Sequence, residues 1–176
     1  MTERQKFQML QKYNSFELRR YEPCVVAEVS VKDDYRSAAN KAFRPLFNYI
    51  SKNNSTATGI SMTAPVVATK QEDSGAQEWI IHFVMPAGST LKDLPHPKDA
   101  KVVLREVPEE DCVAISFRGR ATESLCRKNE EVLRLQAEKE HFQLSPDTRI
   151  ARFDPPFKPG FLMYNEIVIP LLKSEK

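Results

Sequence analysis

Apolar and polar positions along this chain follow the same order of periods twice. Phe16–Tyr21 and Cys24–Val31 alternate between apolar and polar residues, which predicts two half-buried strands. Over residues 35–50 the apolar positions recur every three to four residues, which predicts an amphipathic helix. The short, largely apolar segments Pro65–Thr69 and Trp79–Met85 add two further strands.

The second half repeats this order. Strands are predicted at Lys101–Val107 and Cys112–Arg118, a helix from Thr122 to about Phe142, and strands at Arg149–Phe153 and Asn165–Leu171. Neighbouring strands can pair as antiparallel hairpins, and the sheet then curls around a core with two helices packed outside it. We therefore predict an α+β fold built from a duplicated β-β-α-β-β motif. It forms one domain over residues 1–176, with pseudo-two-fold halves at about 14–86 and 101–171.

Several local signals refine this outline. Asp33 or Asp34 can cap the first helix and Thr122 the second. Pro45 falls within the first helical pattern and should bend that helix or shift its start. Pro65 lacks a donor for a strand ladder, so we expect it at a strand start, an edge or a bulge.

Composition narrows the functional classes. A length of 176 residues and a net charge of +2, with the two signs mixed along the chain, give no basic stripe for nucleic acid. No apolar run approaches the roughly 18 residues of a membrane span, and the N-terminus lacks the apolar segment of a signal peptide. These features predict a cytoplasmic protein, favoured as a monomer, with no nucleic-acid or membrane partner. Three cysteines without a CxxC pair are typical of small buried thiols.

Catalytic motifs are absent. The chain has no GxSxG, HExxH, Walker or GxGxxG sequence, and its three histidines, His82, His96 and His141, do not have metal-ligand spacing. His82 lies in an apolar strand, where an imidazole needs a hydrogen-bond partner or a ligand. We predict no metal site and no catalytic residue, although one enzymatic alternative depends on Glu166.

Glu166 lies among residues that predict burial. A buried carboxylate is costly unless it is paired. It is therefore either a polar anchor in a ligand pocket, with acid–base chemistry as one use, or the partner of an arginine such as Arg19, Arg105 or Arg152 that fastens the sheet.

Two further regions allow both a functional and a structural interpretation. The first helix carries more aromatic surface than one core-facing stripe needs, with Phe43 and Phe47 beside Arg44 and Asn48. It is either a shallow apolar groove for a flat ligand or an ordinary amphipathic helix. The proline-stiffened loop around Lys158 is either a ligand clamp or a solvated connector.

Short sequence pieces in a fixed order give the chain a family resemblance. They are Phe16–Tyr21, Ala42-Phe43, Leu46–Ile50, Asn53-Asn54, Ile60–Val66, Leu94–Pro97, Phe117–Gly119, Asp154–Pro156 and Asn165–Ile167. Together they resemble the SOUL/haem-binding-protein (HEBP) family over about Phe16–Leu171. The resemblance implies a duplicated, distorted antiparallel eight-stranded barrel with two packed helices. That fold is similar to the effector-binding domains of some bacterial regulators, which bind small hydrophobic molecules.

The resemblance also implies a ligand, haem or another tetrapyrrole, and a site along the first helix and the loop before the last strand. Here the implied residues are Phe43, Phe47, Asn48 and Lys158, with Arg44 or Lys158 near a propionate. Some members carry a histidine in the first strand where this chain has Arg20, so an axial imidazole is not available from that position.

These observations predict a cytosolic, non-catalytic haem- or tetrapyrrole-binding protein that carries or buffers its ligand. The alternatives are a binding module for another hydrophobic small molecule and an enzyme acting on such a ligand, with Glu166 as acid or base.

Overall fold

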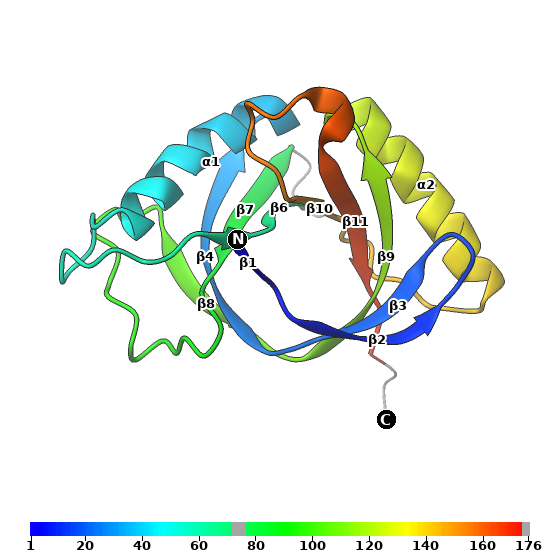
Figure 1. The fold of residues 1–176 in the computed structure, drawn as a ribbon, viewed down its shortest axis with the longest axis horizontal. Coiled ribbons are helices and arrows are strands. Elements are labelled where there is room, and N and C mark those ends of the chain that lie inside the picture. The colour runs from blue at the N-terminus through cyan, green and yellow to red at the C-terminus, as the bar shows by residue number, and fades with distance from the viewer. Residues whose placement is uncertain (72–76, 174–176) are drawn as a thin grey trace.

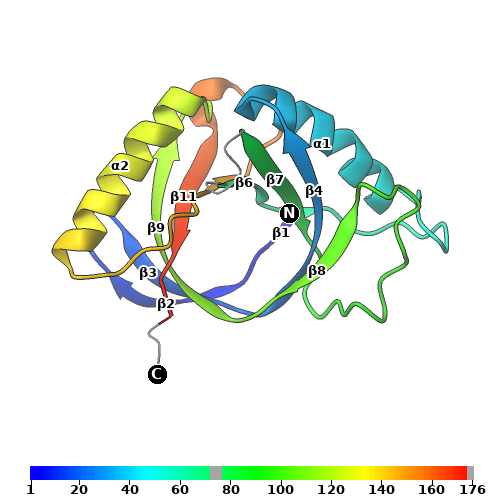
Figure 2. The same cartoon turned by 180° about the vertical axis from the view of Figure 1, so that it is seen from behind.

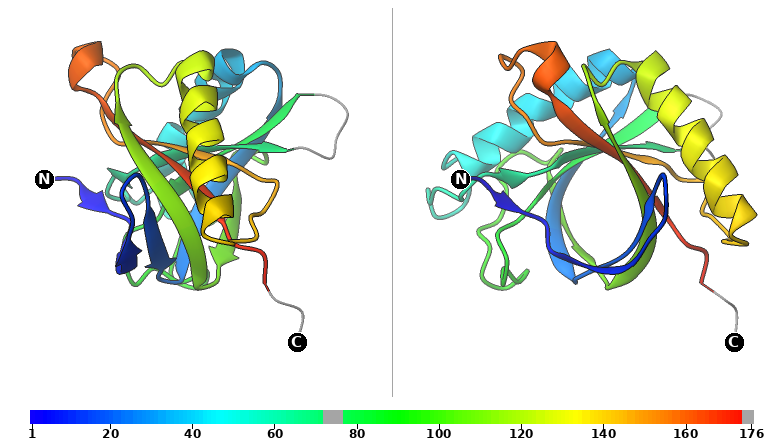
Figure 3. Two further views of the ribbon diagram at one scale, coloured as in Figure 1. Left: turned by 90° about the vertical axis from the view of Figure 1, so that its right-hand side faces the viewer. Right: turned by 45° about the vertical axis from the view of Figure 1, so that its right-hand side comes forward.

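The computed structural model describes residues 1–71 and 77–173. Two helices lie on the outside of a strongly curled antiparallel sheet, which confirms the predicted α+β fold (Figure 1). Figure 2 shows from behind that both helices lie on the same, convex side of the sheet, and Figure 3 shows how far the strands curl toward a closed ring.

Each predicted element is present within a few residues of its expected bounds. The first half contains β3 (Glu17–Tyr21), β4 (Cys24–Lys32), α1 (Tyr35–Ile50), β6 (Val66–Gln71) and β7 (Glu78–Val84). The second half contains β8 (Val103–Val107), β9 (Glu110–Arg118), α2 (Glu123–Lys139), β10 (Arg149–Arg152), the short 3₁₀ helix η1 (Gly160–Leu162) and β11 (Tyr164–Pro170).

The strand order of the large sheet is β2-β3-β9-β11-β10-β6-β7-β4-β8. The strands β3, β4, β6 and β7 of the first half correspond to β8, β9, β10 and β11 of the second half. If β2 is left out and each strand is replaced by its counterpart, the order read from one end is the same as the original order read from the other end. This symmetry supports the interpretation of the chain as two related halves. Helix α1 packs on β4 and β7, and α2 packs on β9 and β11, so each helix covers equivalent strands of its own half.

The two faces of the sheet have different environments because successive side chains of a strand point to opposite sides. On the convex face, residues such as Ile81 and Ile167 pack against Leu46 of α1 and Leu133 of α2, and all four are fully buried. This layer is the main hydrophobic core. The concave face carries the alternate residues and is more polar, which makes it the place where a cavity can form.

Local capping explains where the helices begin. Asp34 accepts a hydrogen bond from the backbone amide of Ser37 at 3.0 Å, and Thr122 accepts one from Leu125 at 3.2 Å. Helix α1 starts directly after Asp34 and continues through Pro45, so the proline does not move its start.

The sheet contains one strand more than the eight that were expected. β2 (Phe7–Lys12) pairs with β3, and β1 (Glu3–Arg4) pairs with β5 (Thr63–Ala64) in a separate two-stranded sheet. All six residues of β2 are exposed, so the strand has no buried alternation to reveal it. Pro65 lies between β5 and β6, at a strand start as predicted.

Candidate functional site

Phe43 and Phe47 form an exposed aromatic pair on α1. They are one turn apart, their rings are stacked with centroids 5.7 Å apart and planes 13° apart, and their exposed fractions are 42% and 47%. The ring of Phe43 also contacts Phe83 of β7, at 5.7 Å between centroids. The sheet therefore supports one ring of the pair while both rings present apolar surface to solvent.

Polar groups border this pair. Arg44 and Asn48 are exposed neighbours on α1, also one turn apart. Within the described residues neither side chain makes a hydrogen bond or ion pair, so the Arg44 guanidinium can meet an anionic ligand group. The structure thus brings four of the five predicted site residues together on one helix.

Lys158 occupies a different setting. It lies in the loop between β10 and β11, which arches between the upper ends of α1 and α2 in Figure 1, and its ammonium donates to Asp154 at 2.7 Å. This ammonium holds the pKa of Asp154 below its usual range, and Asp154 also accepts from the backbone amide of Tyr164 at 2.7 Å. Lys158 is therefore anchored to its own loop, and no hydrogen bond or ion pair joins its side chain to α1 within the described residues. The same loop exposes Phe157 and Phe161, at 87% and 77%.

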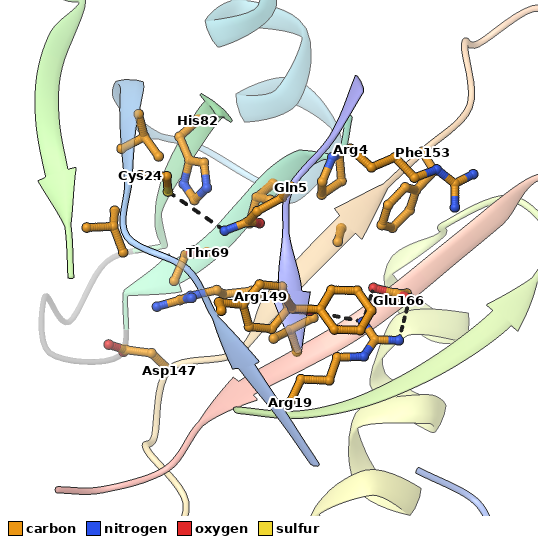
Figure 4. A pocket seen from close by; sticks show the side chains of 18 of the residues that line it. Arg4, Gln5, Arg19, Cys24, Thr69, His82, Asp147, Arg149, Phe153 and Glu166 are labelled. Atoms are coloured by element: carbon orange, nitrogen blue, oxygen red, sulfur yellow. Dashed lines mark hydrogen bonds and ion pairs between the residues drawn. The ribbon is translucent and has the colours of Figure 1, made fainter. Parts of the chain in front are cut away.

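Sequence reasoning missed the cavity on the concave face of the sheet. It has a volume of about 410 Å³, within the range of roughly 300–1,000 Å³ that is usual for small-molecule sites. Figure 4 shows two sides to it: His82, Cys24, Thr69 and Arg149 lie on one, and Arg4, Phe153, Glu166 and Arg19 lie on the other. One feature of the sequence could have indicated this cavity. Several strands that are otherwise apolar carry polar residues at the positions that face the concave side of the sheet. Its apolar lining includes the following residues: Val26, Val67, Ile80, Val107, Ala151 and Val168.

Glu166 lines this cavity and is fully engaged. Its carboxylate accepts two hydrogen bonds from the Arg19 guanidinium at 2.8 and 2.9 Å, and the Tyr164 hydroxyl donates to it at 2.7 Å. Both charged side chains are almost completely buried. Of the predicted arginine partners, Arg19 is the one observed, so the geometry supports the fastening role of Glu166.

His82 is buried at 7% exposure, and within the described residues its imidazole has no hydrogen-bond partner. Burial lowers the pKa of His82 to about 3, and the nearby Arg149 and Arg105 guanidiniums add to the shift. The imidazole is therefore neutral, so it carries one hydrogen-bond donor and one acceptor, and the residue lines the cavity.

The three cysteines are free thiols. Burial raises the pKa of Cys112 and of Cys126 to about 12, which removes thiolate character at neutral pH and fits the predicted structural role. In the part of the chain that the structure describes, no group of three or more His, Cys, Asp or Glu side chains could hold a metal ion. No helix among those residues is long and apolar enough to cross a membrane.

The Asn53-Asn54 piece proves to be a structural fastening. Asn54 is fully buried and donates to the carbonyls of Tyr49 and Thr58 at 2.9 and 2.8 Å, and it accepts from the Thr58 amide at 3.1 Å. Its amide thus ties the loop that follows α1 to the last turn of the helix.

Replacing Asn54 by alanine leaves these backbone groups without partners, so we expect the free energy of unfolding to fall by about 2–3 kcal/mol in urea denaturation. The neighbouring Asn53 is exposed, and an Asn53→Ala variant should stay within about 0.5 kcal/mol of the wild type. Equal losses in the two variants would contradict the fastening role.

The chain matches the family model described as SOUL heme-binding protein over residues 2–170. It belongs to this family. The helix α1 and the loop before β11, which the family resemblance indicated, both lie within the matched range.

Solved structures share the SOUL fold of this chain at low identity. The C-terminal domain of EcmrR is 16% identical with a TM-score of 0.71, covering 95% of this chain and 98% of that domain. A hydrolase from Listeria innocua is 14% identical with a TM-score of 0.62, covering 93% and 94%. The structure of SAV2435 bound to tetraphenylphosphonium is 11% identical with a TM-score of 0.56, covering 89% and 93%. These likenesses show the fold alone. No curated protein matches the chain.

Proposed function

We propose that this SOUL protein binds haem or another tetrapyrrole on the outer face of α1 and serves as a non-catalytic carrier or buffer in the cytoplasm. The observation that carries the proposal is the stacked, half-exposed pair Phe43 and Phe47. Two nearly parallel rings on one helical face give apolar, polarisable surface against which a flat macrocycle can pack.

Charged groups near this face suit the propionates of a porphyrin. Arg44 lies next to Phe43 and has no carboxylate partner among the described residues, so its guanidinium is available for a charge-assisted hydrogen bond. Asn48 can donate from its amide. Lys158, which Asp154 holds, would approach a propionate from the loop and share its ammonium between the two anions.

Iron ligation is not required by this arrangement. None of the three histidines lies on α1 or in the loop of residues 153–163. The face therefore recognises the macrocycle by its surface and its carboxylates. A metal-free porphyrin should bind about as tightly as haemin.

Titration of the purified protein with haemin and with protoporphyrin IX tests this function, followed by the Soret band and by quenching of Trp79. This residue is the only tryptophan and lies in the core layer, on the face of β7 that α1 covers. We expect saturable one-to-one binding of both ligands. Phe47→Ala should weaken both about tenfold, because one stacking surface, worth about 1.4 kcal/mol, is removed.

Leu135→Ala is the matched control, since Leu135 is an exposed apolar residue on α2, at 54% exposure. Binding should be unchanged in this variant. If haemin alone binds, an iron ligand and not the α1 face is responsible. If neither porphyrin binds but another aromatic compound does, the ligand class is wrong.

A further inference from the structure

We propose that the cavity on the concave face of the sheet is a second binding site, for a small apolar carboxylic acid whose acid group is held beside His82. The sheet separates this site from the aromatic face of α1. The inference does not rest on the proposed tetrapyrrole site, because the two use different residues.

The first argument is the unsatisfied imidazole. His82 is more than nine-tenths buried, points into the cavity in Figure 4, and has no hydrogen-bond partner in residues 1–71 and 77–173. Buried polar groups in native proteins are almost always hydrogen-bonded. A ligand that accepts a hydrogen bond from the imidazole N–H would satisfy this group.

The second argument is the charge of the lining. Four arginines line the cavity, Arg4, Arg19, Arg105 and Arg149. Arg105 is paired with Glu28, Arg149 with Glu110, and Arg19 with Glu17 and Glu166, so the count of charges does not decide the sign of the potential at His82. Arg105 and Arg149 are close enough to His82 to help keep it neutral, so the potential at the imidazole is positive. A positive potential beside a free donor selects an anionic acceptor.

The carboxylates do not offer an equivalent site for a cation. Glu166 and Glu17 are both bound by Arg19, with oxygen–nitrogen distances of 2.7–2.9 Å. Asp147 lies at the edge of the cavity, and Figure 4 shows its carboxylate directed away from His82. A lipophilic cation placed beside His82 would therefore lose its hydration without a carboxylate free to pair with it there.

The third argument is the shape and apolarity of the remaining wall. Aliphatic side chains from six strands form it, among them Val67, Ile80 and Val168, and Phe153 and Tyr164 flank the opposite side. Arg4 covers that side, with its guanidinium 5.0 Å from the centre of the Phe153 ring. An aromatic or short aliphatic body fits such a wall, and a fully polar acid would leave it unused.

The test uses two ligands of matched shape and opposite charge, 2-naphthoate and 2-naphthylmethylammonium, titrated calorimetrically into the full chain. We expect saturable binding of the carboxylate, at least about tenfold tighter than that of the ammonium compound. Equal or tighter binding of the ammonium compound would overturn the proposal.

Variants then locate the site. His82→Leu and Arg105→Gln should each weaken 2-naphthoate binding about tenfold or more, because His82 supplies the hydrogen-bond donor and Arg105 contributes to the positive potential at the imidazole. Arg127→Gln is the control for Arg105→Gln, since Arg127 is an exposed arginine on α2 away from the cavity. Phe47→Ala should leave 2-naphthoate binding unchanged. If it abolishes binding, the acid occupies the α1 face and the cavity proposal fails.

A measurement on the unmodified protein covers the case in which His82→Leu does not fold. The ring resonances of His82 should shift on addition of 2-naphthoate, and those of the exposed His96 should not. Binding without any change at His82 would place the ligand elsewhere and contradict the proposal.

Discussion

Replacing Glu166 by leucine is expected to lower the free energy of unfolding by about 3–5 kcal/mol. Arg19 and Glu166 form a two-point ion pair at 2.8 and 2.9 Å, and their side chains are only 5% and 6% exposed. The variant leaves the guanidinium buried without its main partner, and breaking one side of such a pair costs about this much. Glu17 still contacts Arg19, so the loss should fall toward the lower end of the range. Urea denaturation followed by the fluorescence of Trp79 measures it.

A double variant distinguishes the free-energy cost of leaving one buried charge unpaired from the net contribution of the ion pair to stability. Arg19→Leu with Glu166→Leu removes both charges, so it should be less destabilised than either single variant. The control is Arg105→Gln, which breaks a more exposed pair with Glu28 and should cost less than about 1 kcal/mol. A Glu166→Leu protein as stable as the wild type would refute the fastening role. It would also revive the alternative in which Glu166 acts as an acid or base.

The fold could be predicted from the sequence because the apolar residues of its strands and helices recur at the spacing typical of each element. The alternation in Cys24–Val31 and the three-to-four spacing along Tyr35–Ile50 both depend on one buried face, and that face is present in the structure. β2 could not be predicted in the same way, since none of its residues is buried. β2 pairs with β3 at the edge of the sheet, and this backbone pairing produces no apolar pattern in the sequence.

The candidate site was predicted in part. Spacing of four residues places Phe43 and Phe47 on one side of α1, but the period alone does not say whether that side meets the core or solvent. The resemblance to the family supplied that information, and the exposure of both rings agrees with it. Lys158 was expected to be available to a ligand, whereas the structure shows it bound to Asp154 within its own loop.

The cavity could not be predicted because its residues meet only after the sheet curls. Arg19 and Glu166 are 147 residues apart, and nothing local in either strand indicates the other. The polar residues at inward positions of β3, β7, β10 and β11 could suggest burial, but their convergence on one space requires the strand order. That order is the part of the fold that periodicity leaves open.

Strand β7 joins the two proposed sites. Phe83 points to the convex face and contacts the ring of Phe43, while the preceding residue, His82, points into the cavity. The proposed tetrapyrrole surface and the proposed acid site are thus supported by neighbouring residues of one strand, on opposite faces of the sheet. This arrangement lets each site be altered by a side-chain substitution that the other does not contact.

Acidification should destabilise the protein through His82. Its pKa is lowered by burial and by Arg149 and Arg105 from 6.5 in the unfolded chain to about 3 in the folded one. Between these values the unfolded chain binds a proton that the folded protein excludes, so stability is lost as the pH falls from about 6.5 toward 3. From pH 6.5 to pH 4.5 this group alone should account for a loss of about 2–3 kcal/mol, at 1.36 kcal/mol for each pH unit.

Carboxylates also titrate in this pH range, so the quantity to measure is the difference in the free energy of unfolding between a variant and the wild type. His82→Leu lacks the excluded proton, and its unfolding free energy relative to the wild type should rise by about 2–3 kcal/mol between pH 6.5 and pH 4.5. His96→Leu is the control, because it makes the same substitution at an exposed histidine outside the cavity. A ring resonance of His82 that titrates near pH 6.5 in the folded protein would show that the imidazole accepts a proton inside the cavity. The positive potential to which we assign the binding of an acid would then be absent.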